Sequence, residues 1–226
     1  MVRDNHPRER QARKLARKQG QRAPFERVLI VCEGSKTEPL YFQELRAYHR
    51  LNTAHVVVRN SEYGTSPLQV VEFARDLFLA GDAHARTPAK AFDRVYALFD
   101  RDAHESYHAA LTTANALDGK LRNDEKKFIR FLAVASVPCF ELWLLLHFED
   151  VLAPLHRDAA VARLRTHLKN YAKGSGGHFM QTRHALPEAL ARAKNLASQH
   201  GAANGTQPYT NVAELVAWLT SLKPVG

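Results

Sequence analysis

Three carboxylates follow short apolar segments of the sequence. Glu33 follows Arg27–Cys32, and Asp100 and Asp102 follow Arg94–Phe99. Hard divalent cations take oxygen ligands, and magnesium in particular combines one or two protein carboxylates with water and substrate phosphate oxygens. Two aspartates at this spacing can face one ion at a strand end, and Glu33 can complete the site or act as the base that activates water. The pattern predicts a Mg²⁺ or Mn²⁺ site for phosphoryl chemistry, although such pairs of aspartates also arise by chance.

The residues after Glu33 are suited to contact a phosphate group. Gly34 fits a close backbone approach or a positive φ angle at a strand-to-helix turn. The neighbouring Ser35-Lys36-Thr37 resembles part of a phosphate-binding loop, but the GxxxxGK[ST] spacing is absent, which argues against a Walker-type ATPase. Lys36 is predicted either to meet a scissile phosphate or to be an ordinary surface lysine.

These acids need a sheet to position them, and the chain alternates four times between strand and helix patterns. Strands are predicted at Arg27–Cys32, His55–Arg59, Arg94–Phe99 and Phe128–Ala135, and helices near 37–50, after Ser66-Pro67, around 107–121 and over the apolar segment 138–148. The alternation predicts an α/β fold with a mainly parallel sheet and helices on both faces. Ligands of such sheets bind beyond the carboxyl ends of the strands, where all three acids fall.

From about Val151 the sequence shows no convincing strand. Apolar residues at helical spacing predict three helices, around 161–168, 186–197 and 212–219. The glycine-rich segment 173–178 is interpreted as a flexible connector or as a contact to a phosphate backbone. The chain is therefore predicted to consist of a basic arm at 1–25, an α/β core at 26–150 and a helical subdomain at 151–226.

The positive charge is concentrated at the start of the chain. Residues 1–24 hold eight Lys and Arg residues against Asp4 and Glu9, so they carry +6 of the formal net charge of +9. A basic segment with few apolar residues cannot bury a face, and we expect it to be disordered or a solvated helix until it meets a polyanion. It is either a solubilising tail or an arm that binds nucleic-acid phosphates in a salt-dependent way.

Composition indicates a soluble intracellular protein. The 226 residues are 45% hydrophobic, enough for a sizeable core. Cys32 and Cys139 lie in apolar surroundings without CxxC spacing, so they are predicted to be core thiols in a reducing cytoplasm. No apolar segment approaches the length of a membrane span, and the N-terminus lacks the apolar region of a signal peptide.

Three blocks of this sequence resemble those of a known family, the RloB family. They are Val31–Phe42, with the sequence VCEGSKTEPLYF, then Phe99–Asp102, and then Ser136–Phe148, with the sequence SVPCFELWLLLHF. The Asn211-Val212 start of the final predicted helix also fits, so the resemblance covers about residues 26–222. Val137 stands where the family pattern has an asparagine.

The resemblance implies a Toprim-like core and a defence role. Proteins of this family are encoded beside restriction or abortive-infection genes, often with an ABC/AAA-type ATPase. Toprim enzymes use a strand-end glutamate and a later DxD motif to hold magnesium during phosphoryl chemistry, and Glu33, Asp100 and Asp102 match these positions. Glu141 has no counterpart in that motif. Because it is an acid in an apolar helix, we expect it to be a further metal ligand or the partner of an arginine such as Arg101.

The sequence therefore predicts a magnesium-dependent Toprim-type nuclease of phage defence, acting on RNA such as tRNA or on DNA. A topoisomerase or primase would need parts that the sequence does not show. The alternative is a non-catalytic module that binds nucleic acid or regulates the ATPase. We expect the ATPase to dock on residues 151–226 because the sheet edge is needed for substrate, and activation to be release or assembly into a homodimer.

Overall fold

The structure is a computed structural model, which describes residues 26–53, 55–205 and 207–222. The predicted basic arm at 1–25 lies outside the described residues. Among the described residues, no helix is long and apolar enough to cross a lipid bilayer.

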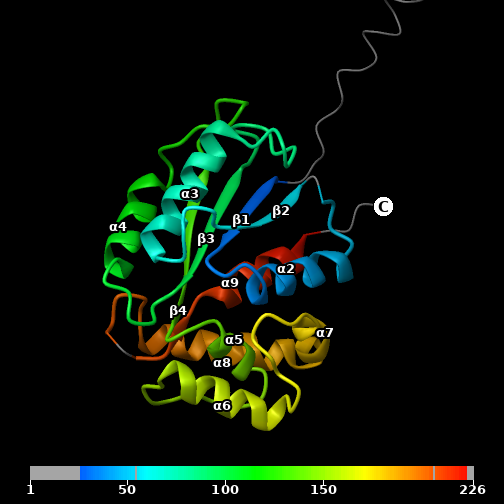
Figure 1. Ribbon diagram of the computed structural model, residues 1–226, viewed down its shortest axis with the longest axis vertical. Helices are drawn as coiled ribbons and strands as arrows, with labels where there is room; N and C mark the ends of the chain where they lie inside the picture. Colours follow the sequence, from blue (N-terminus) through cyan, green and yellow to red (C-terminus); the bar gives the residue numbers. More distant parts are fainter. Residues whose placement is uncertain (1–25, 54, 206, 223–226) are drawn as a thin grey trace, which may run out of the picture.

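A mainly parallel sheet lies at the centre of the molecule (Figure 1). In the described part of the chain its strands are β1 (Val28–Cys32), β2 (Val56–Asn60), β3 (Arg94–Asp100), β4 (Arg130–Val137) and β5 (Tyr209–Thr210), in the order β2-β1-β3-β4-β5. The first four strands are parallel, and β5 pairs antiparallel with the end of β4. The predicted α/β fold with four parallel strands is confirmed.

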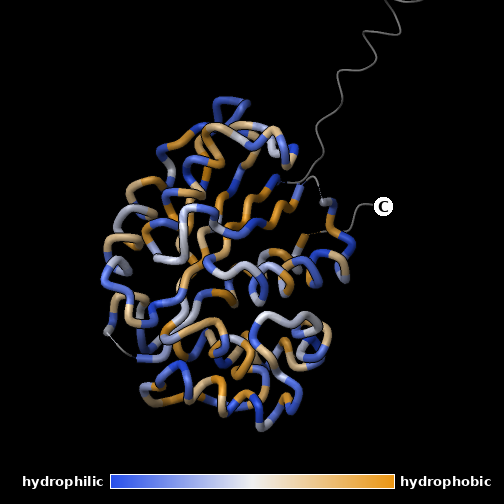
Figure 2. The backbone as a smooth tube through the Cα atoms, in the orientation of Figure 1, coloured by the Kyte–Doolittle hydropathy of each residue, from blue (hydrophilic) through white to orange (hydrophobic). Residues whose placement is uncertain are grey.

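Helices cover both faces of the sheet because the central strands are apolar on both sides. Every residue of β1 is buried. Leu29 and Val31 pack with helices α3 (Pro67–Ala80) and α4 (Tyr107–Leu117). The alternate residues Val28, Ile30 and Cys32 pack on the other face, with α2 (Thr37–Tyr48) and α9 (Val212–Ser221). Figure 2 shows the hydrophobic strands inside and hydrophilic residues on the outer loops.

The remaining helices lie beyond the carboxyl ends of the parallel strands (Figure 1). They are α5 (Glu141–Leu145), α6 (Arg157–His167), α7 (His178–Thr182), a short 3₁₀ helix (Arg183–Ala185) and α8 (Leu186–Gln199). All residues of α5 are buried, as its all-round apolar sequence predicts. One hydrophobic cluster joins the α2 face of the sheet to α5 and to residues from α6 through α9. Residues before and after 150 therefore share a core, and their division into two subdomains stays a prediction.

Two features of the C-terminal region differ from the predictions. The structure contains strand β5, where no strand was predicted, and helix α7, where no helix was predicted and which begins at the last residue of the predicted connector 173–178. Strand β5 has two residues and pairs only with Ser136 and Val137, so it is too short to show a period of two in the sequence. Helix α7 has five residues, and its first backbone N–H groups donate to Glu44 on α2, a partner distant in sequence.

Candidate metal centre

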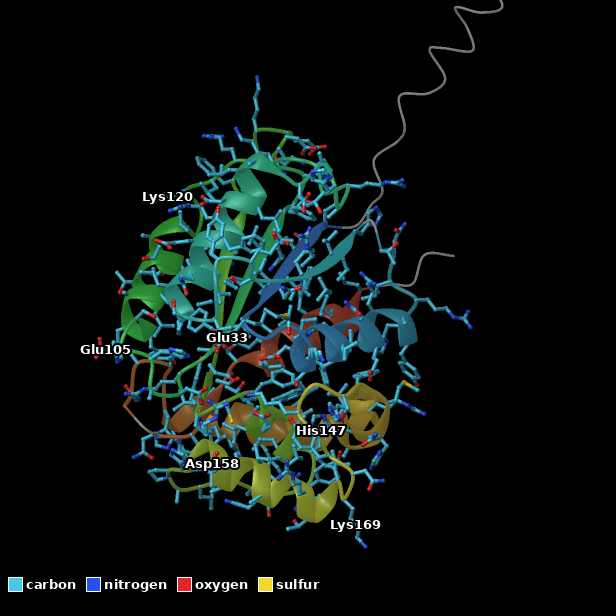
Figure 3. All side chains as sticks on the ribbon, in the orientation of Figure 1. Glu33, Glu105, Lys120, His147, Asp158 and Lys169 are labelled. Atoms are coloured by element: carbon cyan, nitrogen blue, oxygen red, sulfur yellow. The ribbon has the colours of Figure 1, made fainter. Side chains whose placement is uncertain are left out.

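The ends of β1 and β3 bring Glu33 and Asp100 together. Cys32 pairs with Leu98, and the N–H of Glu33 continues the ladder by donating to the Leu98 carbonyl at 2.9 Å. The N–H of Asp100 then donates to Glu33 Oε2 at 2.8 Å. Backbone geometry therefore fixes the position of the Glu33 carboxylate, which lies at the carboxyl edge of the sheet (Figure 3).

The turn after β3 holds Asp102 at the same edge. The N–H of Arg101 donates to the Ser136 carbonyl at 2.9 Å, and that of Asp102 donates to the Pro138 carbonyl at 3.1 Å, so the end of β4 guides the turn. Asp102 has a φ angle of 38°, a conformation that side chains rarely adopt but that aspartate tolerates better than most residues.

Glu33, Asp102 and His104 form the group best placed to hold a metal ion. One ligand atom from each lies within 4.8 Å of the others, and His104 Nε2 is 3.7 Å from Glu33 Oε1. His104 was not among the predicted site residues, although its spacing of two residues from Asp102 continues the spacing between Asp100 and Asp102. Asp100 lies outside this group and is more deeply buried, with 7% of its surface exposed. Its predicted role as a ligand stays a prediction.

Glu38 is a second residue of the site, after His104, that was not predicted from the sequence. It lies in the first turn of α2, where an acid is usually explained by the helix dipole, but it is 8% exposed and faces a cavity that it lines together with Glu33, Asp102 and His104. Gly34 permits this position, because a Cβ atom on Gly34 would lie 2.3 Å from Glu38 Oε2. The glycine therefore serves a close approach, and its φ angle is not in the left-handed region.

Burial and mutual repulsion raise the pKa of three of these acids. Burial raises the pKa of Glu33 to about 7, opposed by the hydrogen bond from Asp100 and reinforced by the charges of Glu38 and Asp102. Burial followed by the charges of Glu38, Glu33 and Glu141 raises the pKa of Asp100 well above its ordinary value. The pKa of Glu38 is also raised, by burial and by Glu141. A divalent cation would relieve this repulsion.

Glu141 has a different environment from the one predicted. Its Oε1 accepts a hydrogen bond from the Tyr171 hydroxyl at 2.7 Å, and no ion pair joins it to Arg101 in the described structure. Burial would raise its pKa, but the hydrogen bonds from Tyr171 and Cys139 and the charge of Lys173 outweigh burial and lower it. The guanidinium of Arg101 lies instead over the Tyr107 ring. The interpretation of Glu141 as the partner of Arg101 is wrong, because Arg101 lies against Tyr107 instead. The other interpretation, that Glu141 is a further metal ligand, stays a prediction.

Positive side chains line the same cavity, and two of them come from the C-terminal region. Arg157, the first residue of α6, donates from Nη1 to Asp102 Oδ2 at 2.5 Å. Lys173 lies in the loop before α7, and the following Gly174 N–H donates to Thr37 Oγ1 at 2.9 Å. Lys36 lines the cavity and is exposed, so both of its predicted interpretations remain open.

The predicted connector at 173–178 is fixed against α2 at several points. Besides the bond to Thr37, the N–H groups of Gly177 and Phe179 donate to the Glu44 carboxylate. A flexible connector would not be expected to make these hydrogen bonds. Their acceptors lie more than 130 residues away, which explains why local composition did not show them.

The cavity has a volume of about 540 Å³. Its lining includes acids from the sheet edge and bases from both halves of the chain: Glu33, Lys36, Glu38, Asp100, Asp102, His104, Arg157 and Lys173. Asp102 Oδ1 is buried and has no hydrogen-bond partner in the described structure. A free carboxylate oxygen beside other oxygens and one imidazole fits a hard or borderline divalent cation.

Comparison with known proteins shows the family of this chain. A family model described as RloB-like protein matches residues 28–219, which include every strand that the described residues form and every residue that lines the cavity. No curated protein and no solved structure matches the chain.

Proposed function

Because the chain belongs to the RloB-like family and carries an acidic cavity that could hold a metal ion, we propose that it is a metal-dependent nuclease. The proposed reaction is hydrolysis of a phosphodiester bond in RNA, with tRNA as one candidate, or in DNA. The observation that carries this proposal is the group of Glu33, Asp102 and His104 at the carboxyl edge of a parallel sheet, with basic residues facing it.

The acids and lysines of the cavity, together with His104, have proposed roles. Glu33, Asp102 and His104 would hold Mg²⁺ or Mn²⁺, with Asp100 as a further ligand in line with the Toprim resemblance. A bound cation stabilises negative charge on a phosphate and lowers the pKa of water. Lys36 and Lys173 would contact the phosphates of the substrate. Glu38, whose pKa is raised by burial and by the charge of Glu141, is the proposed acceptor of the proton from the attacking water.

Defence and control by a partner are part of the same proposal. Family membership supports a role in phage defence with an ABC/AAA-type ATPase as partner, and the described chain shows no GxxxxGK[ST] loop of its own. We propose that this ATPase docks on the part of residues 151–226 that does not line the cavity, since Arg157 and Lys173 of this region face the cavity. Activation would be release from the ATPase or assembly into a homodimer. Copurification of the two proteins, and cleavage in cells that depends on the nucleotide state of the ATPase, would test this part.

The nuclease activity is tested with the full-length chain and with one matched substitution. Purified protein is incubated with total tRNA, other RNA and DNA in the presence of Mg²⁺, Mn²⁺ or a chelator. We expect cleavage only with a divalent cation, and we expect Asp102→Asn to abolish it. Asp158→Asn is the control, because Asp158 is an aspartate on α6 with an 86% exposed side chain. Cation-independent cutting, or full activity of Asp102→Asn, would contradict the proposal. If the protein binds nucleic acid but does not cleave it, either alone or together with the ATPase, the non-catalytic alternative would be favoured.

A further inference from the structure

We infer that Arg157 is a phosphate-binding residue of this site, which pairs with Asp102 without a cation and turns to the substrate once a cation occupies Asp102. The inference rests on the proposed function. It assigns a role to a residue of the C-terminal helices, which the motifs at the sheet edge do not include.

The geometry places Arg157 in competition with a cation. Its Nη1 lies 2.5 Å from Asp102 Oδ2, while Asp102 Oδ1 is buried without a hydrogen-bond partner in the described structure. The Asp102 side chain is 9% exposed, so its charge is poorly screened by water. A divalent cation bound by Glu33, Asp102 and His104 would repel the guanidinium at this distance. A bound cation would therefore weaken the ion pair between Arg157 and Asp102 that is present in the metal-free site.

Arg157 also has room to move without leaving the site. Its side chain is 38% exposed, and it borders a second cavity of about 290 Å³. The lining of that cavity combines apolar residues such as Val137, Pro138 and Leu155 with Arg101, Asp102 and His156. A released guanidinium presents five donors in a planar fork that matches two oxygens of a phosphate. Because Arg157 lines the acidic cavity as well, those donors would face a phosphate bound beside the cation.

Another arginine on the same helix serves as a control. Arg163 donates from Nε to Glu149 Oε1 at 2.8 Å, and its side chain is 40% exposed. It therefore matches Arg157 in element, exposure and acidic partner, but it does not line the cavity. Effects that both arginines share would reflect a general contribution of α6 to stability.

The test measures Mn²⁺ affinity and cleavage separately in the full-length protein. For Arg157→Ala we expect Mn²⁺ alone to bind more tightly by about tenfold in calorimetry, because a like charge has left the site. Cleavage with saturating Mn²⁺ should fall by about 10- to 100-fold, because a charge-assisted hydrogen bond to the phosphate is lost. Arg157→Lys, which keeps the charge and removes the fork, should lie between Arg157→Ala and the unchanged protein in both measurements. Arg163→Ala should change neither.

The two opposite effects distinguish this role from a structural one. A residue that merely supports Asp102 would weaken Mn²⁺ binding and cleavage together when removed. Weaker or unchanged Mn²⁺ binding in Arg157→Ala, or unchanged cleavage, would overturn the inference, and Arg157→Lys supplies the same comparison if Arg157→Ala does not fold. Loss of Mn²⁺ binding in Asp102→Asn, with no effect in either Arg157 variant, would leave the proposed metal site standing and reject Arg157 alone. Failure of the unchanged protein to bind Mn²⁺ would reject both.

Discussion

The acids at the sheet edge and the two basic residues of the C-terminal region that line the cavity differ in how the backbone holds them. Glu33, Asp100 and Asp102 lie at or just after strand ends, and each takes part in a backbone hydrogen bond to a neighbouring strand or its extension. Arg157 and Lys173 come from the start of α6 and from a loop, and both are more exposed than these acids. Backbone contacts fix the acids at the strand ends. The basic groups lie at the ends of longer and more exposed side chains, although the loop that carries Lys173 is itself bonded to α2.

This difference suggests a division of work between the two regions. A metal ion needs its ligands at defined distances, and a parallel sheet edge provides them. A nucleic-acid backbone varies in position, so flexible side chains with positive charge suit it better. Residues before and after 150 share one hydrophobic core, which fixes the position of the C-terminal helices relative to the sheet edge. The division can be tested by changing one side at a time.

The largest expected effect comes from the acidic side. Glu33→Gln should lower cleavage by about 10³-fold or more because it removes a ligand of the proposed cation. The same change should increase the free energy of unfolding without metal by about 1–3 kcal/mol at pH 8, since it removes a buried charge whose pKa is raised to about 7. Chemical denaturation with a chelator, and cleavage with Mn²⁺, measure the two effects. Loss of both stability and activity would mean that Glu33 is chiefly structural.

A smaller effect is expected from the basic side. Lys173→Ala should weaken binding of nucleic acid by about tenfold or less and should flatten its salt dependence, because one phosphate contact is lost. Its affinity for Mn²⁺ alone should not decrease. Lys169→Ala is the matched control, because Lys169 precedes the same loop and is exposed far from Glu33 (Figure 3). Equal binding and equal salt slopes for the two variants would remove Lys173 from the substrate surface.

The smallest expected effect is a dependence of stability on pH that reverses when metal is added. The pKa of Glu33 rises on folding from 4.5 to about 7, so between these values the folded state holds a proton that the unfolded state has released. Without metal, the free energy of unfolding should therefore fall as pH rises through this window, by at most about 1.4 kcal/mol per pH unit for this proton. Asp100 and Glu38 shift in the same direction, and Glu141 in the opposite one.

A bound cation requires ionised carboxylates, so with Mn²⁺ the stability should instead rise with pH over the same range. Thermal unfolding between pH 5 and 8, with a chelator and with Mn²⁺, measures both slopes. Glu33→Gln should make both slopes shallower. Identical slopes with and without Mn²⁺ would show that these acids do not bind it.

Local sequence patterns predicted the sheet and its edge well. Short branched apolar segments that end in acids gave β1 and β3, and Ser66-Pro67 gave the start of α3, where Gln69 completes the cap by accepting from the Ser66 N–H. Such features depend on neighbours in the chain, which is why they are visible in sequence. The three acids of the motifs were found for the same reason.

The sequence by itself determined the alternation of strands and helices, the acids at the strand ends and the family to which the chain belongs. Only the tertiary structure decided which side chains meet those acids. Arg157 reaches Asp102 across 55 residues, and Glu141 pairs with Tyr171 rather than with Arg101. In the sequence, Glu38 is an ordinary acid at the start of a helix, whereas in the structure it is buried and lines the cavity. Charge pairing and desolvation depend on distances in space between residues that are remote in the chain, and local patterns do not encode those distances.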